Sequence, residues 1–179
     1  MTEVGSVYGE ALYDLARSEA LLEKILQQLT ALDDSFAQEP AFAQLLQSPN
    51  LSKQERCDIV DRSFRGQLHP YVLNFLKILT EKGYVRHFHH CVAAFRQHYN
   101  LDHNILPVTA VTAVALTQQQ AQQLTDKLCK LTGKTIDLAQ RVDPAILGGV
   151  RLDSDGTRLE DTVINRLESI SAMLKNTVL

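Results

Sequence analysis

The spacing of the apolar residues changes once along this chain, near residue 105, and that change constrains the fold more than any other feature. Before it, apolar residues recur every three to four positions, which is typical of amphipathic helices. After it, residues 108–116 read VTAVTAVAL and combine β-branched side chains with a period near two, as a strand does. We therefore expect two domains of different class, residues 1–105 and residues 106–179.

Six helices are predicted in the first domain from their apolar stripes and their boundary signals. Ser52 and Glu55 have capping-box spacing, His69-Pro70 suits a helix start, and Gly83 suits a helix end. The helix after His69 is apolar over most of its circumference, which is typical of a central helix in a bundle. A six-helix bundle is the expected architecture.

The second domain is predicted to follow the order strand, helix, strand, strand, helix. Thr117 opens a capping box and Gly133 suits the end of that helix, while residues 146–152 are a third strand candidate. The last helix is predicted to begin near Glu160 or Asp161. The expected fold class is mainly α with a small α/β part. The apolar face predicted for the last helix consists of Val163, Ile164, Leu167, Ile170 and Leu174.

Composition and charge exclude several classes of function. With 18 basic and 21 acidic residues the formal net charge is -3, so the chain has no global positive field to hold nucleic acid. Three cysteines without CxxC spacing fit a reducing compartment, with the cytoplasm as the default. The sequence contains neither a leader pattern nor a run of about 18 apolar residues, so no direct membrane insertion is expected.

The residue patterns that would support catalysis or metal binding are incomplete. His87 and His90 share a helix face, yet no third ligand falls beside them. Asp153 and Asp155 do not have the spacing of a calcium loop, and Gly148-Gly149 lacks the context of a nucleotide-binding turn. We therefore predict no catalytic residue, no cofactor and no metal.

Two helices carry more apolar surface than a small bundle is expected to bury. Such faces can form a groove that accepts an amphipathic helix, or they can simply pack on each other inside the core, and the sequence leaves both readings open. The candidate partner-binding residues are Tyr8, Ala11, Leu12 and Leu15 on the first helix, and Val72, Phe75, Leu76 and Leu79 on the fifth.

Three segments resemble the delta subunit family of F-type ATP synthases, which includes the mitochondrial oligomycin-sensitivity-conferring protein. Residues 8–16 read YGEALYDLA and are similar to the family pattern YxxALYxLA, and residues 74–83 read NFLKILTEKG and are similar to NFLxxLxExG. Residues 142–150 read VDPAILGGV and, with Val163 and Leu167-Glu168, have the family spacing. Where the family commonly shows Asp-Gly-Ser, this chain has Glu160-Asp161-Thr162.

The resemblance implies a stator subunit without chemistry of its own. Its N-terminal bundle would bind the N-terminal helix of an alpha subunit of the catalytic head, and its C-terminal domain would bind the C-terminal ends of the b subunits. One copy per complex would sit at the cytoplasmic face of the bacterial inner membrane and support ATP synthesis coupled to proton transport. The alternative from another class is a free-standing cytoplasmic adaptor that binds some other amphipathic helix, and a metal enzyme using His87 and His90 comes third.

Overall fold

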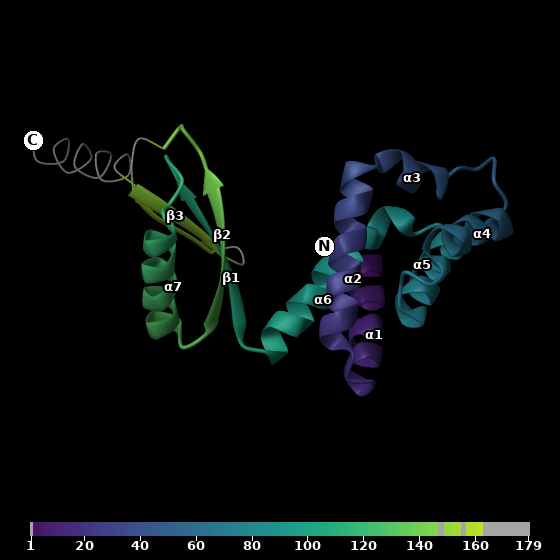
Figure 1. The fold of residues 1–179 in the computed structure, drawn as a ribbon, viewed down its shortest axis with the longest axis horizontal. Coiled ribbons are helices and arrows are strands. Elements are labelled where there is room, and N and C mark those ends of the chain that lie inside the picture. Colours follow the sequence, from purple (N-terminus) through teal and green to yellow (C-terminus); the bar gives the residue numbers. More distant parts are fainter. Residues whose placement is uncertain (1, 147–148, 155–156, 163–179) are drawn as a thin grey trace, which may run out of the picture. The chain divides into compact units, whose positions relative to one another are not determined.

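A computed structural model describes residues 2–146, 149–154 and 157–162, and it is mainly helical with one small sheet (Figure 1). The chain divides into two compact units, Met1–Tyr99 and Asn100–Leu179. The expected class, mainly α with a small α/β part, is confirmed. None of the described helices is both long enough and apolar enough to cross a membrane.

The first unit is built from helices alone. The predicted boundary signals are confirmed: the Ser52 hydroxyl accepts a hydrogen bond from the Glu55 N–H at 3.2 Å, and the Glu55 carboxylate accepts one from the Ser52 N–H at 2.8 Å. His69 caps the next helix, which ends at Gly83 with a φ of 74°. The elements are α1 (Glu3–Ser18), α2 (Leu22–Gln38), α3 (Pro40–Leu45), α4 (Lys53–Phe64), α5 (Pro70–Lys82), η1 (Val85–His87) and α6 (Phe88–Asp102), the last of which runs three residues into the second unit.

One hydrophobic core joins the helices of the first unit. Its largest fully buried members, Phe88 and Phe95, lie on α6 and are 2% and 0% exposed. The ring of Tyr13 meets Phe95 edge-on at 5.4 Å, and Leu76 and Leu79 of α5 are fully buried beside other core residues. Burial of side chains of this size contributes roughly 1.5–3 kcal/mol each, so the core dominates the stability of this unit.

Helix α1 meets α6 through glycines, which the sequence analysis did not single out. A Cβ atom at Gly9 would lie 2.5 Å from the carbonyl oxygen of Cys91 and 2.7 Å from the Cβ of Ala94. A Cβ atom at Gly5 would lie 2.5 Å from the Cβ of His90. The buried face of α1 therefore consists of small residues with Leu12 and Tyr13, and Leu12 is the one residue that it shares with the apolar face predicted from Tyr8, Ala11, Leu12 and Leu15.

The second unit contains a four-stranded sheet of order β2-β1-β3-β4. Strands β1 and β2 are parallel and are joined by α7, while β3 pairs antiparallel with both β1 and β4. Thr117 caps α7 as predicted, and Gly133 ends it with a φ of 68°. The elements are β1 (Ile105–Thr112), α7 (Gln118–Thr132), β2 (Thr135–Val142), β3 (Gly149–Ser154) and β4 (Thr157–Thr162).

The C-terminal part of the second unit corrects two predictions. The third strand begins at Gly149, where φ is 92°, and Ile146 instead lies buried in the turn after Asp143. The helix predicted to begin near Glu160 or Asp161 is wrong at its start, because both residues lie in β4 and pair with Arg151 and Val150 of β3. A cross-strand pairing of this kind is invisible to local helix signals. The rest of that predicted helix, residues 163–179, lies outside the described residues.

Candidate partner-binding surfaces

Five of the eight predicted partner-binding residues lie inside the first unit. Helix α5 is apolar on most sides because the surrounding helices enclose it, and its four predicted residues take part in the common core. In this conformation these five side chains are core residues, so a partner helix has no surface to contact there. They are Leu12 at 4% exposure, Val72 at 0%, Phe75 at 7%, Leu76 at 0% and Leu79 at 0%.

The other three predicted residues lie on the outer side of α1. Ala11 and Leu15 are exposed and Tyr8 is half-buried. Successive helical residues are about 100° apart, so these three share one side of the helix with two further apolar residues. Val7 among them is 59% exposed. We call this surface the α1 strip, and it consists of Val4, Val7, Tyr8, Ala11 and Leu15.

The α1 strip exists because small residues occupy the buried face of the same helix. Gly5 and Gly9 let the α1 backbone approach α6 closely, and the small Ala16 is also buried. The larger apolar side chains of α1 consequently flank the contact instead of filling it. The strip is therefore apolar surface that the first unit leaves uncovered.

Contacts at both ends of its first two turns hold α1 in place. The Thr2 hydroxyl caps the helix by accepting from the Gly5 N–H at 3.3 Å, and it also lies 3.3 Å from Nδ1 of His87. The ring of Tyr8 meets Tyr84 edge-on at 5.9 Å, just after α5. These contacts orient the strip on a fixed scaffold.

His87 and His90, considered as metal ligands, and the neighbouring His89 make contacts within the first unit. Nδ1 of His89 lies 2.7 Å from a carboxylate oxygen of Asp33 on α2, and Nε2 of His87 accepts from Arg86 at 3.0 Å. His90 packs against Gly5, and its buried Nδ1 has no hydrogen-bond partner among the described residues. Within the described part of the chain, no three His, Cys, Asp or Glu residues are placed to hold a metal ion.

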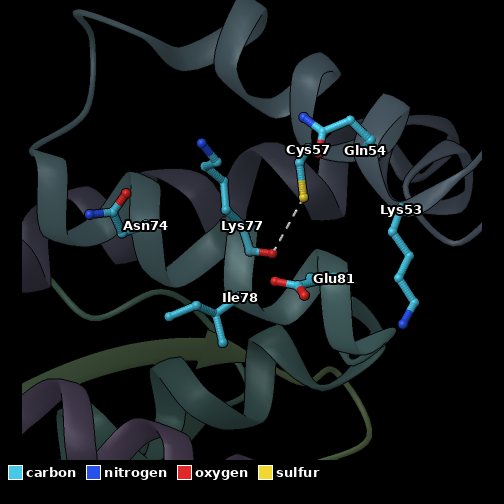
Figure 2. Close-up of a pocket in the computed structure, with 7 residues that line it drawn as sticks. All are labelled: Lys53, Gln54, Cys57, Asn74, Lys77, Ile78 and Glu81. Atoms are coloured by element: carbon cyan, nitrogen blue, oxygen red, sulfur yellow. Dashed lines mark hydrogen bonds between the residues drawn. The ribbon is translucent and has the colours of Figure 1, made fainter.

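A second surface is the groove between α4 and α5, with a volume of about 530 Å³ (Figure 2). The thiol of Cys57 donates to the carbonyl oxygen of Lys77 at 3.8 Å, and burial raises the pKa of this thiol, which makes it a poor nucleophile. Ile78 is 46% exposed at the groove. The lining residues are Lys53, Gln54 and Cys57 from α4, and Asn74, Lys77, Ile78 and Glu81 from α5.

Asp61 forms two ion pairs beside this groove, and the one with Lys77 joins α4 to α5. Lys77 and Arg65 each place a nitrogen 3.0 Å from the carboxylate of Asp61. The hydrogen bonds from Lys77 and then Arg65 hold the pKa of Asp61 below its usual value. Sequence reasoning missed the groove, although Asn74 and Glu81 belong to the segment that resembled the family pattern.

The second unit exposes single apolar side chains on several elements. Val114 is 74% exposed, Leu131 of α7 is 82% exposed and Val142 at the end of β2 is 48% exposed. Charged residues also occur on its sheet, where Asp153 lies 3.4 Å from Arg151 and 3.9 Å from Arg141. Neither unit presents an arrangement typical of catalysis within the described residues.

Comparison with known proteins gives one consistent result. The profile of the ATP synthase delta (OSCP) subunit family matches residues 4–174. The ATP synthase subunit delta of Alkaliphilus oremlandii is 32% identical over 171 residues, which cover 96% of this chain and 95% of the relative. That of Clostridioides difficile is 25% identical over 176 residues, covering 98% and 97%. A chain of the Toxoplasma gondii mitochondrial ATP synthase hexamer shares the fold, with a TM-score of 0.72, 20% identity and coverage of 97% and 98%.

Proposed function

The chain belongs to the ATP synthase delta (OSCP) subunit family, and from that membership we propose how its two units act in the complex. It is a non-catalytic, structural subunit of the peripheral stalk of a rotary ATP synthase. It acts as a stator link that keeps the catalytic head from turning with the rotor. The observation that carries this function is the family match over residues 4–174, with relatives aligned over nearly their whole length.

The first unit is the contact to the catalytic head. In this proposal residues 1–105 act as a six-helix bundle, and the N-terminal helix of an alpha subunit binds to the α1 strip. The strip supports this because it is apolar, exposed and carried by a helix held in place at Thr2 and Tyr8. Amphipathic helices commonly bind by laying an apolar face on such a surface. Tyr8, Ala11 and Leu15 are then direct contacts, and the five buried residues support the surface from inside.

The second unit is the contact to the membrane-anchored part of the stalk. Residues 106–179 bind the C-terminal ends of the b subunits in this proposal. The exposed side chains of Val114, Leu131 and Val142 support this assignment, because covering apolar surface with a partner lowers the free energy of the complex. One copy per complex suffices, since each unit serves a different partner. The subunit is held in this way at the cytoplasmic face of the bacterial inner membrane.

A stator link must outlast many turnovers, and this sets a minimum affinity. With nanomolar affinity, about 12 kcal/mol, and an association rate near 10⁶ M⁻¹s⁻¹, the residence time is on the order of a quarter of an hour. Faster dissociation would let the head slip while ions flow. We therefore expect nanomolar or tighter binding within the complex.

Calorimetry with a peptide of about 25 residues from the N-terminus of the alpha subunit of the same organism tests the assignment to α1. Leu15→Asp in the full chain should weaken binding at least about tenfold, because it places a charge on the apolar contact. Leu45→Asp is the matched control, since Leu45 on α3 is 43% exposed against 39% for Leu15. Equal affinity for both variants would remove the α1 strip from the proposal.

A further inference from the structure

A row of carboxylates borders the α1 strip on one side. Glu3, Glu10 and Asp14 are all exposed, and at about 100° per residue they fall within about 40° of arc on α1. Viewed down the helix axis, Asp14 lies directly beside Val7 of the strip. The opposite border of the strip is the buried face of α1, at Leu12. The exposed strip therefore has one border that carries negative charge and one border that is buried in the first unit.

These carboxylates are available to a partner. Within the described part of the chain, none of the three forms an ion pair. Helix α1 carries a single basic residue, Arg17 in its last turn, so the helix as a whole is acidic. Charges at the rim of an apolar contact act mainly on specificity and on the rate of association, and they do so by matching opposite charges on the partner.

From this arrangement we infer that the α1 strip selects an amphipathic helix whose apolar face is bordered by lysine or arginine. The inference rests on the proposed function, because it specifies the charge pattern of the alpha-subunit helix that binds there. An anionic membrane surface is disfavoured by the same row, which would repel lipid phosphates. A second copy of this chain is disfavoured as well, because pairing two α1 strips would bring the two acidic rows together.

Two designed peptides test the inference with the full chain. Both are helical and share one leucine-rich face, and they differ only in whether lysines or glutamates border that face. We expect the lysine-bordered peptide to bind at least about tenfold more tightly at low salt, and the ratio should shrink in 0.5 M salt as screening sets in. Equal affinities at low salt would overturn the inference, and so would tighter binding of the glutamate-bordered peptide.

Reversing the charges on α1 tests whether its carboxylates cause the preference between the two peptides. The double variant Glu10→Lys/Asp14→Lys should reverse the preference between the two peptides. Asp126→Lys/Asp137→Lys is the matched control, since it makes the same change in net charge at two exposed carboxylates of the second unit. If the control reverses the preference as well, net charge and not the α1 row is responsible, and the inference is wrong.

The alpha-subunit peptide separates this inference from the proposed function. If that peptide binds, responds to Leu15→Asp and is weakened about tenfold by Glu10→Lys/Asp14→Lys, both are supported. If it responds to Leu15→Asp but not to charge reversal, the function stands and the charge selection is wrong. If it ignores Leu15→Asp while the designed peptides still discriminate by charge, the assignment of the alpha helix to α1 fails instead. Measurable binding of the full chain to anionic vesicles, or its self-association at the same concentration, would contradict the choice of partner.

Discussion

Helices α5 and α7 both end at a glycine with a left-handed backbone conformation, yet the two units of the molecule bury them to different degrees. In the first unit α5 has five buried residues, including Leu76 and Leu79 at 0% exposure. In the second unit α7 has no buried residue, and its Leu131 is 82% exposed. The difference teaches that apolar spacing determines which side of a helix faces inward, while the number of surrounding elements determines how far it is buried.

Because their helices are buried to different degrees, the two units should differ in how easily they open locally. A helix whose side chains belong to a shared core opens only with its whole unit, while a helix without a buried residue opens at lower cost. The first unit is thus suited to present a fixed surface such as the α1 strip. The second unit has exposed apolar side chains at Val114, Leu131 and Val142, where we propose that a partner binds.

Thiol reactivity should show the largest contrast between the two units. Cys91 of α6 is 1% exposed and burial raises its pKa to about 11, while Cys129 of α7 is only half-buried. Because the thiolate is the reactive form and Cys91 needs the core to open, we expect Cys129 to react at least about a hundredfold faster. Reaction of single-cysteine variants with an aromatic disulfide reagent at pH 8 measures both rates. Equal reaction rates would show that the two units do not differ in how far they protect their helices.

The second-largest contrast should be the loss of stability when a core side chain is shortened. Leu76→Ala removes a fully buried side chain and should lower the free energy of unfolding of the first unit by about 2–5 kcal/mol. Ile78→Ala on the same helix is the control, and at 46% exposure it should cost less than about 1 kcal/mol. Urea denaturation followed by far-UV circular dichroism measures both. Similar losses for the two variants would mean that α5 is not enclosed as described.

Gly9→Ala tests the contact that exposes the α1 strip. Alanine normally stabilises a helix interior by about 1 kcal/mol over glycine, but here its Cβ would lie 2.5 Å from the Cys91 carbonyl oxygen. We expect a net loss of about 1–3 kcal/mol, because α1 and α6 must separate. Thermal unfolding of the full chain is the measurement. A gain in stability would show that α1 does not approach α6 through its glycines.

The smallest effect concerns pH. Hydrogen bonds from Lys77 and Arg65 lower the pKa of Asp61 in the folded protein below its usual value of 3.8. The ionised Asp61 therefore stabilises the fold at pH values above 3.8, and this stabilisation is lost as the pH falls through the lowered pKa. Asp61→Asn should therefore reduce the difference between urea midpoints measured at pH 6 and pH 3. Asp34→Asn, at an exposed carboxylate on α2, serves as the control. An unchanged difference for Asp61→Asn would remove this link between α4 and α5.

Much of the fold could be predicted because its signals are local. The capping boxes at Ser52 and Thr117 and the terminating glycines Gly83 and Gly133 all lie where the sequence indicated. Strand β4 could not be predicted in this way, because Glu160 became part of a strand through pairing with Arg151 and not through its neighbours in sequence.

The candidate surface was only partly predictable. Periodicity grouped Tyr8, Leu12 and Leu15 on one apolar face of α1, but it could not say which of them other helices cover. The Gly5-x-x-x-Gly9 spacing was the available signal, since small residues at this spacing permit close helix packing. With α1 packed on α6 through these glycines, Leu12 lies in the core and Leu15 lies on the surface.

We propose that this subunit holds the catalytic head through the outer side of α1. Inverted membrane vesicles stripped of the endogenous subunit and supplied with the full chain measure it directly through ATP-driven ion uptake. We expect wild type and Leu45→Asp to restore uptake, while Leu15→Asp, checked for unchanged thermal unfolding, should leave ATP hydrolysis intact without uptake. Full restoration of uptake by folded Leu15→Asp would contradict it.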